Sequence, residues 1–275
     1  MKKIGIIVAM DKEYEQLSKV FEDRTDIVLQ KCGIGKVNAA VGATEMLRDH
    51  QPDLIVSSGC AGGASTSLEV MDVVAASSCA YHDVYCGDNA AYGQVLGMPA
   101  RFEAPQALID KALQIPRVKA GLTVSGDWFV DSKEKMREIL DHFPEAMAVD
   151  MESCAIAQVC HRYAVPFISF RVISDIPLKD TKASQYFDFW DRVAEDSFEV
   201  TLRFVESILL SDAQGKKTDP HRPLQAKEKQ GINREKEQWK RYPVSRLTTI
   251  VCFAASTSPA RTRWAAMSSR RLTFA

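Results

Sequence analysis

Three acidic residues lie just beyond short apolar runs, at positions where a side chain could take part in catalysis. Glu13, Glu152 and Asp175 each follow, within four residues, a run that is typical of a buried strand. Because ligands of open α/β sheets bind at the carboxyl ends of the strands, we expect these three carboxyl groups to meet in one site. Carboxyl groups in such a site suit acid–base catalysis.

Cleavage of an N-glycosidic bond needs a set of groups of this kind. The sugar becomes positively charged in the transition state, so a nearby carboxylate stabilises it. An acid protonates the leaving base, and a second carboxylate activates water on the opposite face, as in inverting glycosidases.

Each of these residues also has a simpler interpretation. Glu13 and Glu152 would favour the dipole of a helix whose first turn they occupy, and Asp175 would cap a turn. Phe129 would be an ordinary core residue. These alternatives stay open as long as the residues are considered one at a time.

Two glycine-rich segments also follow predicted strands. We predict that Gly33-Ile34-Gly35-Lys36 and Gly59-Cys60-Ala61-Gly62-Gly63 are turns, in which the absence of side chains lets the backbone approach a ligand. A short glycine pattern is weak support by itself, and tight turns without a ligand remain the alternative.

Apolar runs and amphipathic stretches alternate along most of the chain, which predicts an α/β fold. We expect a three-layer α/β/α architecture with a central mixed sheet. Strands are predicted at residues 4–9, 27–32, 54–56, 73–76, 119–125, 147–149 and 166–173. Helices are predicted at residues 12–22 with Asp11 as the cap, after Lys36, at 105–114, from Ser132, at 151–163 and at 187–210.

Charge is distributed unevenly between the two ends of the chain. Residues 1–211 carry 21 Lys and Arg against 31 Asp and Glu, whereas residues 212–275 carry 14 against 5. An acidic body argues against nucleic-acid binding, which needs clustered basic residues. Apolar periodicity stops after about Ser211, so we predict one domain at 1–211 and an atypical basic, disordered tail at 212–275. Translation of an altered reading frame, or a basic arm for nucleic acid or anionic membrane, are the alternatives for the tail.

The seven cysteines show neither a CxxC motif nor a spacing with His that is typical of metal ligands. We therefore expect no metal and a reducing, cytoplasmic location. No apolar run approaches the ~18–20 residues of a membrane span, so no membrane association is expected.

Taken together, the segments resemble the nucleoside phosphorylase/hydrolase superfamily and, within it, the 5′-methylthioadenosine/S-adenosylhomocysteine nucleosidases. The resemblance extends over about residues 3–210 in the order typical of that family. The matching stretches are Ile4-Gly5-Ile6-Ile7-Val8-Ala9-Met10 with Glu13, Gly33-Ile34-Gly35-Lys36-Val37, Gly59-Cys60-Ala61-Gly62-Gly63, Tyr81-His82-Asp83, Ser125-Gly126-Asp127-Trp128-Phe129-Val130, Ala148-Val149-Asp150-Met151-Glu152 and Arg171-Val172-Ile173-Ser174-Asp175.

The resemblance implies an enzyme that hydrolyses the N-glycosidic bond of 5′-methylthioadenosine and S-adenosylhomocysteine without a metal or organic cofactor. Asp175 would protonate adenine N7 with help from Ser174. Glu13 would activate the attacking water, with Arg171 nearby.

The resemblance also implies the residues that bind the nucleoside substrate, and a homodimer. Cys60, Ala61 and Gly62 would border the pocket, and a neighbouring subunit would complete it with its residues 81–100. The other implied contacts are Glu152 with the ribose hydroxyls, Met151 with the sugar, Phe129 and Val130 with adenine, and Met10, Ile34 and Phe187 with the 5′-alkylthio group.

Two features depart from the family pattern. About 15 residues are absent between the Glu13 helix and Gly33, which shortens the chain near residue 25. Cys60 stands where many members have Ser, and a thiol is the poorer hydrogen-bonding group. A nucleoside phosphorylase, a hydrolase of futalosine or another 5′-modified nucleoside, and an inactive paralogue therefore remain alternatives.

Overall fold

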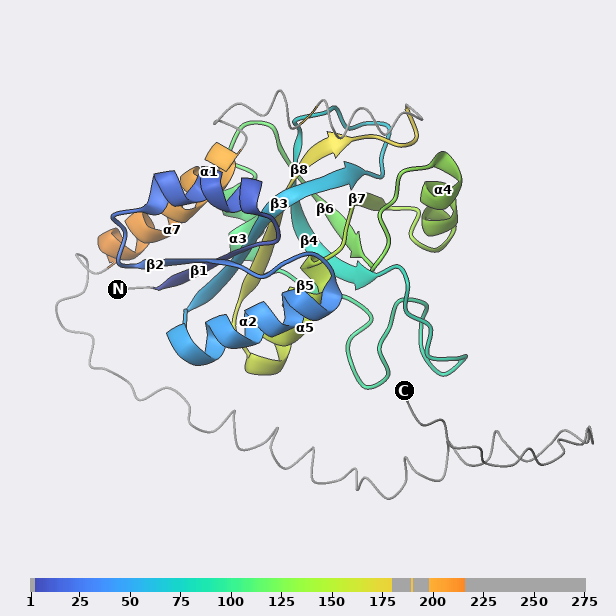
Figure 1. Ribbon diagram of the computed structural model, residues 1–275, viewed down its shortest axis with the longest axis horizontal. Helices are drawn as coiled ribbons and strands as arrows, with labels where there is room; N and C mark the ends of the chain where they lie inside the picture. The colour runs from blue at the N-terminus through green and yellow to red at the C-terminus, as the bar shows by residue number, and fades with distance from the viewer. Residues whose placement is uncertain (1–2, 180–188, 190–197, 216–275) are drawn as a thin grey trace, which may run out of the picture. The chain divides into compact units, whose positions relative to one another are not determined.

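A mixed sheet of eight strands forms the centre of the part of the chain that the computed structural model describes, residues 3–179, 189 and 198–215 (Figure 1). The sheet order is β2-β1-β3-β7-β6-β4-β5, and β8 pairs with both β3 and β4. The strands are β1 (Ile4–Val8), β2 (Ile27–Lys31), β3 (Leu54–Gly63), β4 (Val73–Tyr81), β5 (Phe102–Glu103), β6 (Val118–Ser125), β7 (Ala146–Asp150) and β8 (Phe167–Asp175).

Five of these strands close on themselves. β3 runs parallel to β8, β8 antiparallel to β4, and β4 and β7 both run parallel to β6. The ring is completed where β7 meets β3 in antiparallel orientation, with Gly62 opposite Val149 and Gly63 opposite Ala148. The ends of β3, β7 and β8 are therefore brought together at one place.

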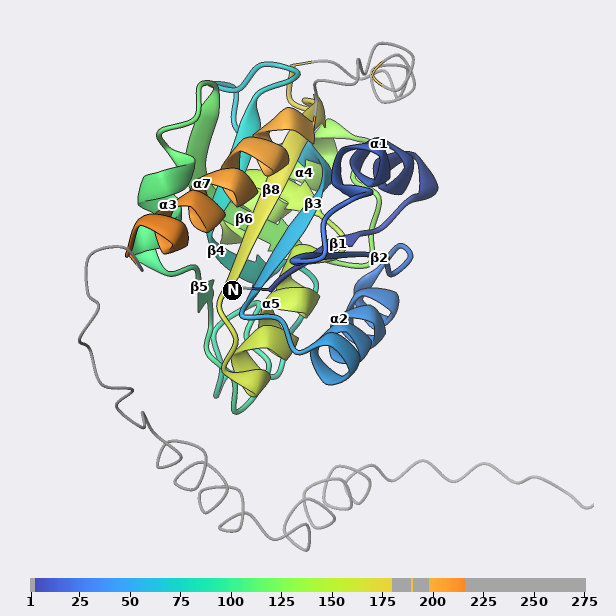
Figure 2. The ribbon, with the colours of Figure 1, turned by 90° about the vertical axis from the view of Figure 1, so that its left-hand side faces the viewer.

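Helices cover both faces of the sheet, as predicted for a three-layer α/β/α fold. One face packs against α1 (Asp11–Phe21), α3 (Gln106–Ala112) and α7 (Glu199–Gly215), and the other against α2 (Lys36–His50) and α5 (Ser153–Tyr163), as Figure 2 shows. A further helix, α4 (Lys133–His142), packs against residues of β6 and β7 in a third apolar cluster.

β1 illustrates why the apolar runs form central strands. All five of its residues are buried. Ile4 and Ile6 enter the apolar cluster under α1 and α7, whereas Ile7 enters the cluster under α2 and α5. A strand that is covered on both faces needs apolar residues at every position, which explains the continuous run in the sequence.

The predicted turn at Gly59–Gly63 is wrong, because these residues continue β3. Here β3 leaves its partner β1 and pairs with β7, and its register with β8 shifts between Ala61 and Gly62. Glycines within a strand commonly mark such an irregularity or a close approach of neighbouring groups. Here the glycines serve strand pairing and not reversal of the chain.

Other boundaries differ from prediction by smaller amounts. Met10, not Asp11, is the N-cap of α1, whereas Ser132 caps α4 as predicted, with Lys135 N donating to its hydroxyl. β5 was not predicted. α7 begins at Glu199 and continues to Gly215, beyond the predicted end at 210. The earlier part of that predicted helix lies outside the described residues except for Phe189, and most of the predicted tail also lies outside them.

Candidate active site

A pocket opens where β1, β3, β7 and β8 end, and it encloses about 650 Å³ with its open mouth included. Its walls combine four carboxyl groups with apolar side chains. The lining residues are Ala9, Met10, Glu13, Ile34, Cys60, Ala61, Gly62, Trp128, Phe129, Val130, Val149, Asp150, Met151, Glu152, Ser174 and Asp175. A second, smaller cavity shares Ala9, Glu13, Cys60 and Glu152 with this pocket and adds Arg171.

Glu13 is 2% exposed, and backbone N–H groups hold both of its carboxylate oxygens. Oε2 accepts from the amides of Ala9 at 2.9 Å and Met10 at 3.0 Å, and Oε1 accepts from the amide of Cys60 at 3.1 Å. Burial raises the pKa of Glu13, and the Arg171 charge and these donors offset the rise only in part. Glu13 therefore closes the first turn of α1, as the simpler interpretation held, and also faces the pocket.

The Cys60 thiol lies 3.7 Å from Glu13 Oε1. Burial raises the pKa of Cys60 well above its ordinary value, so the thiol stays protonated and acts only as a weak donor. Gly59 is the neighbouring residue, and a Cβ atom there would come within 2.8 Å of Glu13 Oε1. A side chain at position 59 would therefore displace the carboxylate.

Asp175 at the end of β8 has a much sparser environment than Glu13. Its Oδ1 accepts a hydrogen bond of 2.6 Å from the Ser174 hydroxyl, which also lies 3.2 Å from the carbonyl oxygen of Ala61. Burial raises the pKa of Asp175, and the bond from Ser174 lowers it by less. A carboxyl group in this state can carry a proton and deliver it.

Glu152 connects two parts of the chain that are far apart in sequence. Its Oε1 accepts from the amide of Gly35 at 2.8 Å. Burial, together with the nearby Asp150 charge, raises the pKa of Glu152. Glu152 is the N-cap residue of α5, where its charge favours the helix dipole, but its side chain makes no capping hydrogen bond and binds the Gly35 amide instead, so the simpler interpretation does not account for all of its contacts.

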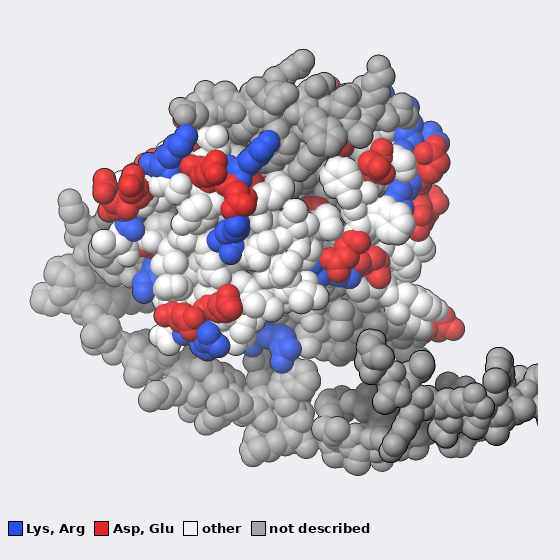
Figure 3. Space-filling model, viewed as in Figure 1, with Lys and Arg blue, Asp and Glu red and all other residues white. Residues whose placement is uncertain are grey.

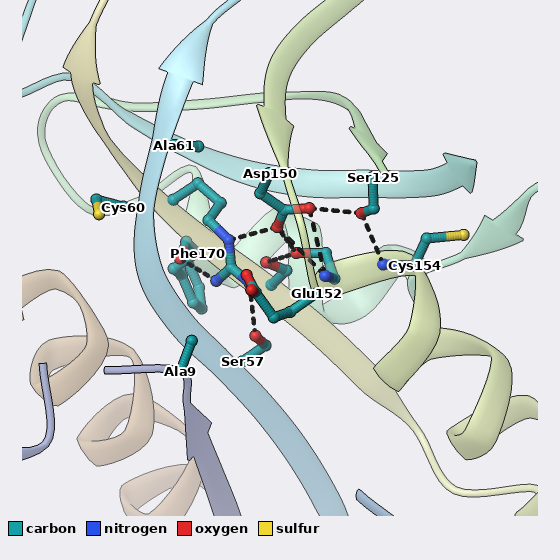
Figure 4. Close-up of polar contacts among 12 residues, drawn as sticks. Ala9, Ser57, Cys60, Ala61, Ser125, Asp150, Glu152, Cys154 and Phe170 are labelled. Atoms are coloured by element: carbon teal, nitrogen blue, oxygen red, sulfur yellow. Dashed lines mark hydrogen bonds and ion pairs between the residues drawn. The ribbon is translucent and has the colours of Figure 1, made fainter. Parts of the chain in front are cut away.

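Arg171 is 2% exposed and is fixed by a network that its sequence context did not reveal (Figure 4). Its Nε donates to Asp150 Oδ2 at 2.6 Å, and its two terminal nitrogens donate to Ser57 Oγ and to the carbonyl oxygen of Phe170. Burial lowers the pKa of Arg171, but the surrounding carboxylates outweigh that effect and keep it charged. The guanidinium thus supplies a fixed positive charge between Asp150 and Glu13.

Serine hydroxyls hold Asp150 in turn. Ser125 Oγ donates to Asp150 Oδ1 at 2.5 Å, and Ser153 donates to Oδ2 through its hydroxyl. Ser153 Oγ also lies 2.7 Å from Ser169 Oγ. Because these groups come from β6, β7, α5 and β8, the network ties together the strand ends that carry the carboxyl groups.

The outer wall of the pocket is apolar and partly open. Phe129 is 51% exposed and Trp128 is 55% exposed, so neither is a plain core residue. Ile34 is 51% exposed on the α2 side of the same pocket, whereas Val130 is buried. Exposed aromatic and aliphatic side chains at a pocket mouth offer a surface for a flat, apolar ligand.

The structure brings nearly all of the residues predicted for the site into this one pocket. Arg171 lines the adjoining cavity instead, and Phe187 lies outside the described residues. The sequence reasoning missed Ala9, Trp128, Val149 and Asp150 as lining residues. Asp150 carried a detectable signal, since it is an acid at the end of a predicted strand, two residues before Glu152.

Among residues 3–179, 189 and 198–215, no cluster of three or more His, Cys, Asp or Glu side chains has the arrangement of a metal site. Within the same residues, no helix is both long and apolar enough to cross a membrane.

Comparison of the sequence with known proteins identifies the protein class independently of the fold and the pocket. The sequence profile described as the phosphorylase superfamily matches residues 19–209. The 5′-methylthioadenosine/S-adenosylhomocysteine nucleosidase of Haemophilus influenzae (strain PittEE) is 38% identical over 233 residues, covering 75% of this chain and 100% of that protein. The protein with the same name from Geobacillus sp. (strain WCH70) is 36% identical over 230 residues, covering 75% of this chain and 99% of its own length.

A solved structure agrees with these relatives. The crystal structure of the Neisseria meningitidis 5′-methylthioadenosine/S-adenosylhomocysteine nucleosidase in complex with methylthio-immucillin-A superimposes with a TM-score of 0.70 at 38% sequence identity. The match covers 75% of this chain and 100% of that one. The chain belongs to the 5′-methylthioadenosine/S-adenosylhomocysteine nucleosidase family within the phosphorylase superfamily.

Proposed function

We propose that this chain hydrolyses the N-glycosidic bond of 5′-methylthioadenosine and S-adenosylhomocysteine, releasing adenine and the 5-thio-substituted ribose. The observation that carries the proposal is the placement of Glu13, Glu152 and Asp175 around one pocket, each with a different set of hydrogen-bond partners. Three carboxyl groups in different environments can act as base, sugar ligand and acid in one reaction.

Asp175 acts as the acid. It donates its proton to adenine N7 while the bond between C1′ and N9 breaks and the bonding electrons pass to the purine. The Ser174 hydroxyl keeps Asp175 oriented through its 2.6 Å hydrogen bond. Burial that raises the pKa of Asp175 favours the protonated form that this step requires.

Glu13 acts as the base on the opposite side of the sugar. It accepts a proton from water as the water oxygen bonds to C1′, and Arg171 supplies a nearby positive charge. The proton gained by Glu13 and the proton lost by Asp175 balance through solvent after the products leave. Three backbone N–H donors hold Glu13 and prevent it from swinging away between turnovers.

The remaining residues bind the substrate. Glu152 accepts hydrogen bonds from the ribose hydroxyls, Met151 packs against the sugar, and Phe129 stacks on adenine, whose edge meets the backbone of Val130. Met10 and Ile34 contact the 5′-alkylthio group. Cys60, Ala61 and Gly62 form the strand wall beside Glu13.

Hydrolysis is favoured over phosphorolysis by the charge of the pocket. The charged residues that line it, among those described, are the acids Glu13, Asp150, Glu152 and Asp175. The guanidinium of Arg171 is already bound to Asp150 in the adjoining cavity. A phosphate anion placed against these carboxylates would be repelled, whereas neutral water would not.

The test is adenine release from 5′-methylthioadenosine and S-adenosylhomocysteine by the purified full chain, with and without phosphate. We expect release at the same rate in both conditions and free 5-thioribose as the second product. Futalosine and 5′-deoxyadenosine serve as comparison substrates for the 5′ specificity. Release that requires phosphate, or no release from either main substrate, would overturn the proposal.

We further propose that the enzyme is a homodimer in which residues 81–100 of one subunit complete the pocket of the other. Ile34, Val37 and Val41 form an exposed apolar stripe that runs from the pocket mouth along α2, with Val37 73% exposed. The face seen in Figure 3 carries acidic and basic side chains in small mixed groups separated by uncharged surface. The exposed apolar stripe on α2 suits association.

Sedimentation of wild type and Val37→Glu tests the dimer. Because Val37 is exposed, the charge should leave the subunit folded, and we expect a monomer with reduced turnover. A dimeric Val37→Glu variant would argue against this interface, and a monomeric, fully active wild type would argue against the homodimer.

We also propose that the protein is cytoplasmic. Cys79, Cys154 and Cys160 are buried free thiols, and burial raises the pKa of each, as expected for cysteines that serve as small apolar residues in a reducing cytoplasm.

We propose that the nucleosidase domain comprises residues 1–211, together with the last turn of α7, and that residues beyond it contribute nothing to catalysis.

A further inference from the structure

Three charged residues lie beside the pocket mouth without lining it, and they come from segments far apart in the sequence. Lys36 begins α2, Asp83 follows the end of β4, and Asp127 follows the end of β6. The proposed chemistry uses none of the three.

These residues form a closed set of hydrogen bonds. Lys36 Nζ donates to Asp83 Oδ2 at 2.7 Å, and the Lys36 backbone amide donates to Asp127 Oδ1 at 2.7 Å. The Asp127 amide donates to the same Asp83 Oδ2 at 2.8 Å, and Lys36 Nζ lies 3.8 Å from Asp127 Oδ2. Each residue therefore contacts the other two, and we call the set the mouth clamp.

Lys36 and Asp127 of the mouth clamp each lie two residues from a residue that lines the pocket. Ile34, two residues before Lys36, lines the pocket, and the Gly35 amide donates to Glu152. Phe129, two residues after Asp127, lines the opposite wall. The clamp is thus a direct polar connection between the turn that holds the sugar-binding carboxylate and the loop that carries the aromatic wall.

The two segments approach so closely that one position requires glycine. Gly35 has φ of +92°, and a Cβ atom there would lie 3.0 Å from Asp127 Oδ1. A residue with a side chain would be strained in this backbone conformation and would push Asp127 away. The loop and the turn are therefore positioned by contact as well as by charge.

The three side chains of the mouth clamp are partly exposed, so salt in the solution can weaken their ion pairs. The side chains of Lys36, Asp83 and Asp127 are 23%, 27% and 48% exposed. Lys36 Nζ also lies 5.5 Å above the Tyr81 ring. Ion pairs at this level of exposure are modest in strength and are weakened by salt, although several charges in one network exceed an isolated pair.

We propose that Lys36, Asp83 and Asp127 are positioning residues that hold the loop of residues 126–131 against the α2 turn and thereby set the affinity of the pocket for the purine. This inference rests on the proposed stacking of adenine on Phe129. The clamp preorganises the two walls before the ligand arrives, so that binding does not have to order them. It leaves the reacting carboxyl groups unchanged.

The test compares Lys36→Met with the matched control Lys119→Met in the full chain. Lys119 forms an ion pair of 2.8 Å with Asp72 at the opposite ends of β4 and β6, away from the pocket. For Lys36→Met we expect KM for 5′-methylthioadenosine and Kd for adenine to rise about threefold to tenfold, in line with a partly exposed charge network. kcat should stay within about twofold, because Asp175, Glu13 and Glu152 keep their partners.

Three further readouts separate positioning from a general loss of stability. Lys36→Arg should restore most of the affinity, and KM should rise with salt in wild type but not in Lys36→Met. Hydrogen exchange of residues 126–131 in ligand-free protein should be faster in Lys36→Met than in Lys119→Met.

The exchange measurement needs no substrate, so it tests the clamp even if the proposed reaction fails. Unchanged exchange of residues 126–131 in Lys36→Met would overturn the clamp itself. Faster exchange with unchanged KM and Kd would overturn its role in purine affinity. Absence of adenine release by the wild type would overturn the proposed function alone.

Discussion

The carboxyl ends of β1 and β8 lie at the same edge of the sheet, but they place Glu13 and Asp175 in contrasting environments. At the end of β1, three backbone amides and a nearby guanidinium surround Glu13. At the end of β8, a single serine hydroxyl supports Asp175. Burial raises the pKa of both groups, but only at Glu13 do several donors favour the ionised form.

This difference shows how one pocket can favour the ionised form of one carboxyl group and the protonated form of another. Donors that are fixed in the backbone stabilise a carboxylate and cannot rotate away from it. A hydroxyl can both donate and accept, so it supports either protonation state of its partner. The contrast supports the proposed assignment of Glu13 as base and Asp175 as acid.

Replacing the acid should produce the largest effect. We expect Asp175→Asn to lower turnover by ~10²–10⁴-fold, because an amide cannot supply the proton that general acid catalysis requires. The measurement is kcat for adenine release, with circular dichroism as the check that the fold is intact. Turnover of a folded variant near the wild-type rate would remove Asp175 from the acid role.

Replacing the proposed base should also lower the rate of hydrolysis strongly, and it should affect stability as well. In Glu13→Gln the amide NH₂ must face at least one backbone N–H donor of Ala9, Met10 or Cys60. We therefore expect Glu13→Gln to have a lower Tm than Asp175→Asn while it still binds 5′-methylthioadenosine in calorimetry. Wild-type turnover would contradict the assignment, and equal melting temperatures would contradict the described contrast.

The pH dependence of stability sharpens the comparison at Asp175. Burial raises its pKa in the folded protein, so the folded state binds the proton more tightly, and stability is lost as pH rises from the ordinary pKa of about 4 through the folded pKa. Asp175→Asn should therefore melt at a higher temperature than wild type at pH 7. We expect the difference between the two melting temperatures to vanish as pH falls below the ordinary pKa. A difference that grows at low pH would contradict a raised pKa of Asp175 in the folded protein.

The smallest effect is expected from the carboxyl-terminal segment. A chain that ends at Gly215 keeps all of α7 and every residue of the pocket that the structure describes. We expect its specific activity to equal that of the full chain. A fall in Tm of more than ~5 °C, which corresponds to about 1–2 kcal/mol in a domain of this size, would make the segment part of the fold.

The sequence was most informative where burial dictates residue type. The run that forms β1 could be predicted because both of its faces are covered. The extension of β3 through Gly59–Gly63 could not be predicted, because glycines carry no side chains that alternate between two faces. The two-residue β5 is too short to show any periodicity.

The candidate site also contains residues that the sequence predicts and residues that it does not. The three carboxyl groups were predictable because an acid within four residues of the end of an apolar run is conspicuous. The network around Arg171 was not, because Ser57, Ser125 and Ser169 lie on different strands and serines are common on protein surfaces. Only the pairing of the strands places Ser57 beside Arg171, Ser125 beside Asp150, and Ser169 beside Ser153, which in turn holds Asp150.

The closure of the sheet has a consequence for the order of folding. β7 joins β3 through two residue pairs, Gly62 with Val149 and Gly63 with Ala148, which are separated by many intervening residues. The pairings of β8 with β3 and β4 span even longer stretches of the chain. Contacts of such long sequence separation incur the loop-closure entropy before they gain stability, so we expect the ring of strands to close late. Cys60, Ala61 and Gly62 lie on one side of this junction and Asp150, Met151 and Glu152 on the other. During refolding we therefore expect the helices and the locally paired strands to form before the pocket does, and nucleoside binding to appear only when the ring of strands closes.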